Sequence, residues 1–410
     1  MDGQMNSVAR CRWLVAVCWF GALPINAGPA NAPTISIRLF EIFHPQSLEI
    51  SGAATPSVYH AANGFHQTKK NPLLIFSAND TFLPNSSEWI RIDRTAAAIQ
   101  IAGNGFNHSL KLTDTINVAA AAPTLSVKSG NKLFKRSYSG KLKIFAIGRE
   151  LCIVNFVSSE DYLAGILAAE MPNADWAALQ AQAVVARTFM IKNAPRHASN
   201  GYRFCDLTHC QTYKGSDGIT AKIQQAIAST KDEILTFNHQ PIDAYYSSTC
   251  GGTTADDAGI WAESTDRPYL KIIVDSTNCA VSPHFRWQAR LSAARLHQIW
   301  QHHFGEPISS MAVTKQGNDG RVRELAIVGH SLHLINGEDF RTVMGRESGW
   351  NTIKSTAFNF AVDKNDYIFS GRGLGHGLGL CQYGAMAMAR KEYSYQRILG
   401  HYFPGTEIKK

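Results

Sequence analysis

The sequence predicts a mixed α+β protein with a β-rich N-terminal part followed by a helix/strand core. Short β-branched and aromatic runs, separated by Gly, Asn and Ser, fill residues 33 to about 157. Helical patterns follow at 159–170 and 175–195, and strands then alternate with helices to the C terminus. A hydrophobic content of 45% with 18% charged residues excludes wholesale disorder.

The first 32 residues have the three-part layout of a secretory signal peptide. Arg10 and Arg12 precede the apolar run WLVAVCWFGALPI, and Ala30-Asn31-Ala32 forms a small-x-small cleavage pattern. We therefore expect an exported protein, in the periplasm, in the cell wall or outside the cell. An uncleaved signal has the same layout, so an N-terminal membrane anchor is the alternative. No later run approaches the roughly 18 apolar residues of a transmembrane helix.

The β-rich region is expected over residues 33–150. Its strands are predicted in the runs ISIRLF, LEISG, IQIAG, LSVKSG, KLKIFAIG and, at the boundary, LCIVNFV. The loop-rich residues 52–90, part of an insertion at 52–120, receive no assignment.

Positive charge is concentrated in this N-terminal part. Residues 33–150 hold 13 Lys/Arg against 7 Asp/Glu, whereas residues 151–410 hold 25 against 24. The excess lies in VKSGNKLFKRSYSGKLK at 127–143, which alternates like a hairpin around Ser-Gly turns. This segment is either a solvated face or a surface that attracts an anionic polymer such as cell wall. Export disfavours nucleic acid as the partner.

The second region, 151–410, is expected to be mixed. One helix is predicted from about Ser159 to Glu170 and a second after an N-cap at Asp175. Further helices are predicted in ITAKIQQAIAST, SAARLHQIWQHHF and EDFRTVMG, and at the C terminus after a Gly-rich stretch. Strand pairs are predicted in ILTFNHQPIDAYYSST and in RVRELAIVG with SLHLIN. An inserted helix/strand subdomain is expected at about 285–350.

Glu170 is a lone acid at the end of an apolar run, directly before Met171 and Pro172. A helix cannot readily continue into the proline, so the carboxyl group falls in the last turn, where the helix dipole disfavours negative charge. Apolar neighbours act in the same direction, and both effects favour the protonated form that a general acid needs. An ordinary surface glutamate at a helix end is the alternative that the residues alone leave open.

Four blocks, in order, resemble the SpoIID/LytB family, the group of stage II sporulation protein D and the amidase enhancers. They are EDYLAGILAAEMPNADWAALQAQAVVARTFM, then YRFCDLTHCQTYKG, then AYYSSTCGGTTADDAGIW with PYL, then GRGLGHGLGLCQYGAMAMA before ILGHYFPGTEI. They cover about residues 150–410. The resemblance implies that 151–410 is a SpoIID-like catalytic domain.

The resemblance also implies an activity. Active members are peptidoglycan lytic transglycosylases, which cleave glycan strands, preferably denuded ones, and leave 1,6-anhydro-MurNAc ends. Glu170 matches the family's catalytic glutamate, and one carboxyl group suffices for this chemistry, so the carboxylate pair of ordinary glycosidases is not required. The alternative is a non-catalytic peptidoglycan-binding enhancer of an N-acetylmuramoyl-L-alanine amidase. The basic segment 127–143 fits that alternative.

The same comparison assigns substrate-binding positions. Six residues match polar positions of the family blocks: Gln182, Arg187, Tyr246, Ser248, His376 and Gln382. For Gln182 and Arg187 the alternative is an exposed helix face. The chain departs from the family at Ser247, where His is frequent, at Leu374, where Trp is frequent, and at Cys381, where Ser is common. The glycines of GRGLGHGLGLCQ match neither phosphate-binding fingerprint.

Six cysteines would remain after signal cleavage, in a compartment where thiols pair or hold metal. His197, Cys205, His209 and Cys210 offer two imidazoles and two thiolates, a set that suits a structural tetrahedral zinc ion. Some members of the family bind zinc with a similar cluster. A Cys205–Cys210 disulfide is the alternative. No cofactor is required for the chemistry itself.

The other cysteines receive separate predictions. A Cys250–Cys279 disulfide would tie the YYSSTCGG loop to IIVDSTNC, although sequence cannot prove the pairing. Cys152 lies in a strand pattern and is expected to fill a buried apolar position. Cys381 with His376 as base would make a nucleophile only with an orienting partner that sequence does not reveal.

Overall fold

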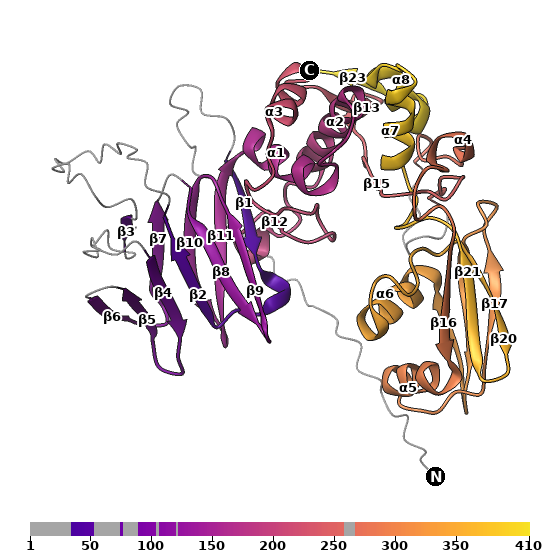
Figure 1. Ribbon diagram of the computed structural model, residues 1–410, viewed down its shortest axis with the longest axis horizontal. Coiled ribbons are helices and arrows are strands. Elements are labelled where there is room, and N and C mark those ends of the chain that lie inside the picture. The colour runs from indigo at the N-terminus through magenta and orange to yellow at the C-terminus, as the bar shows by residue number, and fades with distance from the viewer. Residues whose placement is uncertain (1–33, 53–73, 77–88, 104–105, 120–121, 258–266) are drawn as a thin grey trace, which may run out of the picture. The chain divides into compact units, whose positions relative to one another are not determined.

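The computed structural model describes residues 34–52, 74–76, 89–103, 106–119, 122–257 and 267–410 (Figure 1). The predicted signal peptide, residues 1–32, and most of the loop-rich segment 52–90 lie outside the described residues. Across the described part of the chain, no helix combines the length and apolar character needed to cross a membrane.

Two six-stranded sheets make up the predicted β-rich region, although the sequence did not predict how the strands group into sheets (Figure 1). The first sheet has the order β12-β1-β11-β10-β7-β3 and contains β1 (Thr34–Leu39), β3 (Leu74–Phe76), β7 (Thr115–Ala119), β10 (Lys141–Ile147), β11 (Glu150–Ser158) and β12 (Phe204–Cys205). The second has the order β6-β5-β4-β2-β8-β9 and contains β2 (Ser47–Ser51), β4 (Trp89–Arg94), β5 (Ile99–Gly103), β6 (Phe106–Leu110), β8 (Thr124–Ser129) and β9 (Lys132–Ser137). All neighbouring strands are antiparallel except β1 and β12, which are parallel.

Alternate side chains of both sheets point into one hydrophobic core. Ile37 and Ile144 of the first sheet and Ile50 and Ile92 of the second are fully buried in the same cluster. Burial along these strands therefore has a period of two residues, as expected for strands with one face in a core. The cluster continues into the helices that carry the site.

The basic segment 127–143 is a hairpin only in its first part. β8 and β9 pair antiparallel around Gly130, which has φ +57°, whereas Ser139 and Gly140 lead the chain into β10 of the other sheet. A side chain at Gly140 would collide with the Phe156 carbonyl oxygen, so the crossing requires glycine. Five lysines of the segment are exposed: Lys128, Lys132, Lys135, Lys141 and Lys143.

Three helices follow the sheets: α1 (Ser159–Glu170), α2 (Trp176–Lys192) and α3 (Ala221–Ser229). α1 begins after Ser158, whose hydroxyl accepts the Asp161 N–H, and it ends before Pro172 as predicted. Asp175 is the predicted N-cap of α2, but its side chain makes no capping bond and instead pairs with Arg390 at 3.1 Å.

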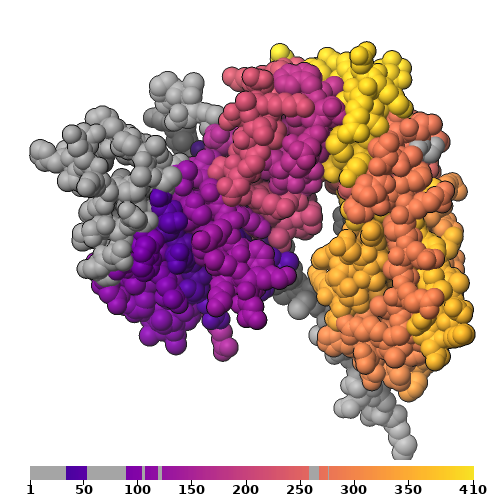
Figure 2. Space-filling view, viewed as in Figure 1, coloured from indigo at the N-terminus to yellow at the C-terminus, as the bar shows by residue number. Residues whose placement is uncertain are grey.

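The C-terminal part holds further helices and several small sheets. The helices are α4 (Ser276–Cys279), α5 (Ala293–Phe304), α6 (Gly337–Ser348), α7 (Gln382–Arg390) and α8 (Tyr395–Tyr402). Earlier in the chain, the described residues also include the short 3-10 helices η1 (Glu41–Phe43) and η2 (Ala198–Asn200). The sheets have the orders β14-β13-β23, β15-β22, β16-β21-β20 and β17-β18-β19. α7 and α8 pack against α2, which Figure 2 shows as yellow atoms beside magenta ones.

The strands of these sheets include both strand pairs that the sequence predicted. Their bounds are β13 (Ile234–Phe237), β14 (Gln240–Pro241), β15 (Tyr246–Ser247), β16 (Trp287–Ser292), β17 (Ser310–Gln316), β18 (Val322–Val328), β19 (Leu332–Asn336), β20 (Phe358–Asp363), β21 (Asp366–Gly371), β22 (Leu380–Cys381) and β23 (Glu407–Lys409). Residues between Trp287 and Phe369 form a hydrophobic cluster of their own, with Trp300 and Phe340 fully buried in it.

Candidate active site

Glu170 is the last residue of α1, and its carboxylate is half-buried. Its Oε1 accepts the backbone N–H of Thr212 at 3.0 Å, and its Oε2 lies 3.5 Å from the Gln382 side-chain nitrogen. One oxygen is therefore fixed by a strong donor, whereas the other has a single long contact. This asymmetry leaves Oε2 as the oxygen able to exchange a proton with a ligand.

The loop that carries Thr212 is clamped against α1. The ring of Tyr213 packs where a side chain at Gly165 would stand, and its hydroxyl donates to Asn155 Oδ1 at 2.9 Å. The donor to Glu170 is thus a backbone N–H next to a buried tyrosine. Because the donor is a backbone group, it does not depend on the identity of the side chain, and the sequence therefore did not identify Thr212.

Tyr246 lies beside Glu170. Burial raises the pKa of the Tyr246 phenol well above its ordinary value, and the charge of Glu170 raises it further. Its hydroxyl oxygen is buried without a hydrogen-bond partner among the described residues. β15 pairs parallel with β22, and this pairing brings Tyr246 next to the start of α7 at Gln382. The phenol is neutral and has its hydrogen-bonding capacity unused.

Arg187 does not reach the site, contrary to its predicted substrate contact. It is 3% exposed, and its guanidinium donates to the carbonyl oxygens of Thr230 and Glu233 at 2.8 and 3.2 Å. Burial lowers the pKa of Arg187, while Glu160, 3.6 Å away, opposes that change. These contacts satisfy carbonyl groups beyond the C terminus of α3, which is a structural role.

Gln182 is also fully buried, and neither atom of its amide has a partner within the described part of the chain. It is therefore on neither the exposed helix face nor an open groove. Ser248 is half-buried, and its carbonyl oxygen accepts the Tyr383 N–H at 3.1 Å. Of the six predicted contacts, Gln382 lies within 3.5 Å of the Glu170 carboxylate, and Tyr246 lies close enough for the charge of Glu170 to raise its pKa.

His376 is half-buried, and its Nδ1 accepts the Leu378 N–H at 3.0 Å. Burial lowers its pKa to about 3, and the positive charges of Arg341 and Arg321 contribute. The imidazole is therefore neutral at physiological pH. Cys381 is fully buried, with its sulfur accepting the Cys250 N–H at 3.3 Å. A thiol held inside the protein in this way does not support the nucleophile alternative.

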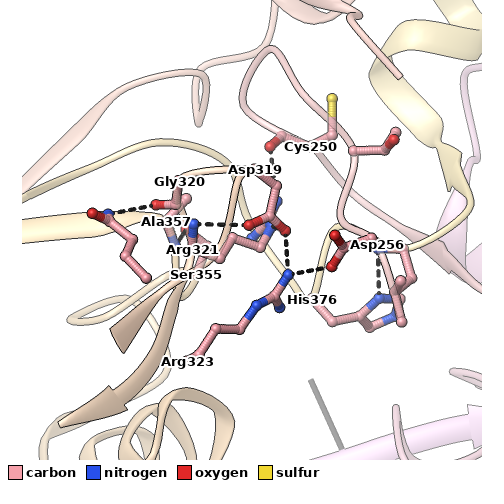
Figure 3. Close-up of polar contacts among 12 residues, drawn as sticks. Cys250, Asp256, Asp319, Gly320, Arg321, Arg323, Ser355, Ala357 and His376 are labelled. Atoms are coloured by element: carbon pink, nitrogen blue, oxygen red, sulfur yellow. Dashed lines mark hydrogen bonds and ion pairs between the residues drawn. The ribbon is translucent and has the colours of Figure 1, made fainter. Parts of the chain in front are cut away.

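Arg321, in the turn between β17 and β18, contacts the loop that contains Cys250 (Figure 3). It is fully buried, donates to the Cys250 carbonyl oxygen at 2.9 Å, and fills the space where a side chain at Gly377 would stand. Asp319, also buried, lies between Arg321 and Arg323 and pairs with both. A buried guanidinium with this role carried no signal in the sequence.

The four residues His197, Cys205, His209 and Cys210, here the His/Cys cluster, come together. His197 Nε2 lies 3.3 Å from Cys210 Sγ, and His209 Nδ1 lies 3.7 Å from both sulfurs. Bonds of 2.0–2.3 Å in a tetrahedron give ligand separations of about 3.3–3.8 Å, so the set fits zinc. Both cysteines are free thiols. Cys210 stands two residues before Thr212, the donor to Glu170.

Cys250 and Cys279 are neighbours, as predicted, but they are not bonded. Their sulfurs lie 3.4 Å apart, well beyond the roughly 2.05 Å of a disulfide. Asp275 and Cys381 complete a fully buried group, here the thiol–carboxylate cluster. Cys152 is buried among apolar neighbours, as predicted.

Two surface hollows lie away from Glu170. One is lined by residues of α4, α7 and α8, among them Thr277, Lys391 and His401. The other lies over the start of α2 and the link between α7 and α8. Neither is lined by Glu170.

Two family models match the chain. That of SpoIID, stage II sporulation protein, matches residues 148–237, and that of a domain of unknown function, DUF8618, matches residues 275–379. The first includes Glu170 and the His/Cys cluster. The second includes Arg321, Asp275 and Cys279.

Similar proteins occur in two bacterial genera. The stage II sporulation protein D of Bacillus subtilis is 30% identical over 274 residues, which are 63% of this chain and 76% of that protein. An uncharacterized protein of Brachyspira hyodysenteriae is 30% identical over 278 residues, 66% of this chain and 72% of that one. The amidase enhancer of Bacillus subtilis is 29% identical over 295 residues, 60% of this chain and 40% of that one.

Proposed function

The chain belongs to the family of stage II sporulation protein D, and on that premise we propose that it is a peptidoglycan lytic transglycosylase with Glu170 as its catalytic acid. The observation that carries the proposal is the half-buried carboxylate at the end of α1, with Oε1 fixed by Thr212 and Oε2 available. The substrate is the glycan strand, preferably denuded of peptide stems.

One carboxyl group is enough for this reaction. The protonated group donates its proton to the glycosidic oxygen as the bond from that oxygen to the anomeric carbon breaks. The carboxylate left behind accepts the proton of the sugar's own 6-hydroxyl, whose oxygen bonds to the anomeric carbon. The products are a free hydroxyl on one sugar and a 1,6-anhydro ring on the other, and Glu170 ends protonated again.

The neighbours of Glu170 have distinct parts in this scheme. The Thr212 N–H holds Oε1 and so orients the group. We propose that the Gln382 amide, which lies 3.5 Å from Oε2, binds a sugar oxygen of the substrate. The Tyr246 hydroxyl is buried, so we assign it no direct contact with the sugar. Positioning and electrostatic contacts of this kind act together with the acid.

The His/Cys cluster is proposed to hold a structural zinc ion. When bound, the ion would fix the loop from η2 to Thr212, because Cys210 is two residues from the donor to Glu170. We further propose that residues 1–32 direct export, since peptidoglycan lies outside the cytoplasm. The exposed lysines of 127–143 would face an anionic polymer of the wall.

Glu170→Gln tests the proposal, because it keeps the shape of the side chain and removes the proton. We expect release of anhydro-muropeptides from denuded sacculi to fall by about 100-fold or more, as measured by mass spectrometry. Glu160→Gln, at the other end of α1, is the matched control and should retain the activity. A Glu170→Gln protein as active as the unmutated chain would remove Glu170 from the reaction.

A second candidate function is enhancement of a cell-wall amidase. Similarity to the amidase enhancer and the exposed lysines of β8 and β9 favour it. If this is the function, the protein alone will pellet with sacculi and release no anhydro products, but it will increase peptide release when an N-acetylmuramoyl-L-alanine amidase is added.

A further inference from the structure

We infer that the thiol–carboxylate cluster is a second metal site, in which Cys250, Asp275, Cys279 and Cys381 hold a zinc ion. One ligand atom from each residue lies within 4.8 Å of all the others, and all four residues are at most 1% exposed. The site is separate from the His/Cys cluster and shares no residue with it.

The separations fit a metal better than a covalent bond. Cys250 Sγ lies 3.4 Å from both Cys279 Sγ and Asp275 Oδ2. Tetrahedral zinc with Zn–S bonds near 2.3 Å and Zn–O bonds near 2.0 Å separates its ligands by about 3.5–3.8 Å. A disulfide between Cys250 and Cys279 would leave Cys381 and Asp275 beside it with no role.

Backbone N–H groups point at the sulfur atoms. Gly252 donates to Cys279 at 3.1 Å, and both Cys250 and Gly384 donate to Cys381, at 3.3 and 3.4 Å. Gly251 and Gly252 have φ of +79° and +100°, a conformation that turns the chain sharply directly after Cys250. Such donors stabilise thiolate charge on metal-bound sulfur.

The Asp275 carboxylate is held by hydrogen bonds from neighbouring side chains. Tyr402 and Asn278 each donate to Asp275 at 2.9 Å, and His401 lies 3.6 Å from it. A side chain at Gly384 would collide with the Tyr402 hydroxyl and with Asp275, so α7 can approach the carboxylate only with glycine there. Ligands held by outer hydrogen bonds are the usual arrangement of protein metal sites.

Ligand type selects the ion. Three thiolates and one carboxylate, closed and buried, suit a structural zinc ion rather than Mg²⁺ or Ca²⁺, which prefer oxygen ligands. Binding displaces three thiol protons, and the ion's two positive charges offset part of the ligands' negative charge. The ion would join three segments distant in sequence: the loop after β15, α4, and the start of α7.

Two ligands of the proposed ion are linked to residues near Glu170 or to the support of a neighbouring loop. Cys381 directly precedes Gln382, whose amide lies beside Glu170, and the Cys250 carbonyl oxygen accepts from Arg321 (Figure 3). The second ion would therefore fix the loop that contains Cys250 and the start of α7, which carries Gln382. The His/Cys cluster would fix a different segment, the loop that carries Thr212.

Metal counting on the full chain tests the inference. The protein is purified under reducing conditions without chelators, and zinc per chain is measured by elemental analysis and native mass spectrometry. We expect two ions in the unmutated chain, one in Cys279→Ala and in Cys381→Ala, and two in the matched control Cys152→Ala. Cys205→Ala should lose the other ion, and the Cys205→Ala/Cys279→Ala double variant should lose both.

Cobalt(II) substitution gives a readout that does not require the variants to fold. Thiolate-to-cobalt absorption per unmutated chain should correspond to five thiolate ligands in two sites, rather than two in one site. A metal ion that is lost in Cys205→Ala but retained in Cys279→Ala, with no second ion in the unmutated chain, would overturn the inference, as would a Cys250–Cys279 disulfide seen by peptide mass mapping. Two ions retained in Cys279→Ala would also overturn it.

Discussion

The two clusters beside Glu170 differ in how the chain assembles them. The His/Cys cluster is built within 14 consecutive residues, 197–210, and His209 is exposed. The thiol–carboxylate cluster gathers ligands from residue 250 to residue 381, and all four are buried. Each ends within two residues of a partner of Glu170, at Thr212 and at Gln382 respectively.

Because the two clusters are assembled differently, we expect one to contribute mainly to stability and the other mainly to activity. Closing a long stretch of chain restricts the unfolded state more than closing a short one, so the thiol–carboxylate cluster should contribute more to global stability. The short cluster fixes one loop, whose N–H orients the acid, so its loss should lower activity more than stability.

The largest expected effect is on stability. Cys279→Ala should lower the free energy of unfolding by about 3 kcal/mol in zinc-containing buffer, because it removes a buried ligand and leaves the other three without their ion. Denaturant unfolding followed by circular dichroism measures this. Cys152→Ala, an equally buried thiol outside both clusters, should lose only about 1 kcal/mol. Equal losses in the two variants would contradict the proposed duty.

The next effect is on activity. Cys205→Ala should reduce anhydro-muropeptide release by about 10- to 100-fold, since the loop carrying Thr212 would lose its anchor. Its loss of unfolding free energy should be smaller than that of Cys279→Ala. If Cys205→Ala lost its zinc but kept full activity, the link from this cluster to Glu170 would be wrong.

A smaller loss of activity is expected from removing the contact between Gln382 and Glu170. Gln382→Ala removes one long contact to Glu170, worth about 1 kcal/mol, and should lower kcat about fivefold with zinc content unchanged. Gln180→Ala removes a comparable amide contact, to Ser229 at 3.0 Å, away from the site. Activities that fall equally in both variants would exclude a specific role for Gln382.

The smallest effect is a pH dependence of stability. His376 has a pKa of about 3 when folded, against an ordinary value of 6.5, because burial disfavours its charged form. The unfolded chain therefore binds the proton more readily, so this contribution is complete above pH 6.5 and is lost as the pH falls toward 3.

Between pH 7.5 and 5.5 the loss should be about 1 kcal/mol, measured by denaturant unfolding at each pH. His376→Gln should flatten this part of the profile, whereas replacing His302, which is 79% exposed, should not. An unchanged profile in His376→Gln would show that another group is responsible.

Local patterns predicted the fold well. The strands, α1 and α2, and the later strand pairs follow from periodicity and from stop signals such as Pro172. The crossing from β9 to β10 was missed, because Ser139-Gly140 has the same composition as a hairpin turn. Whether the strand after such a turn pairs with the preceding strand or joins another sheet depends on tertiary packing, which the local sequence does not show.

The site was predictable where its ligands are close in sequence or carry a family motif. Glu170, Gln382 and the His/Cys cluster are of this kind. Thr212 acts through its backbone, and Asp275 lies far from its partner Cys381, so neither leaves a side-chain pattern. The predicted substrate contact of Arg187 was wrong, because a polar side chain on a helix can bind buried carbonyl groups as readily as it can face a substrate.

The contacts of Arg321 limit how the part of the chain that contains Glu170 could be transplanted into another protein. Arg321 lies in the region matched by the domain of unknown function, as Gly377 does, and it also donates to the carbonyl oxygen of Cys250, which lies outside both matched regions. A chimera that retained Glu170 but replaced residues 319–323 would leave an empty space next to Gly377 in the glycine-rich segment. Residues 319–323, the loop that contains Cys250 and the glycine-rich segment must therefore be exchanged together, as a single graft.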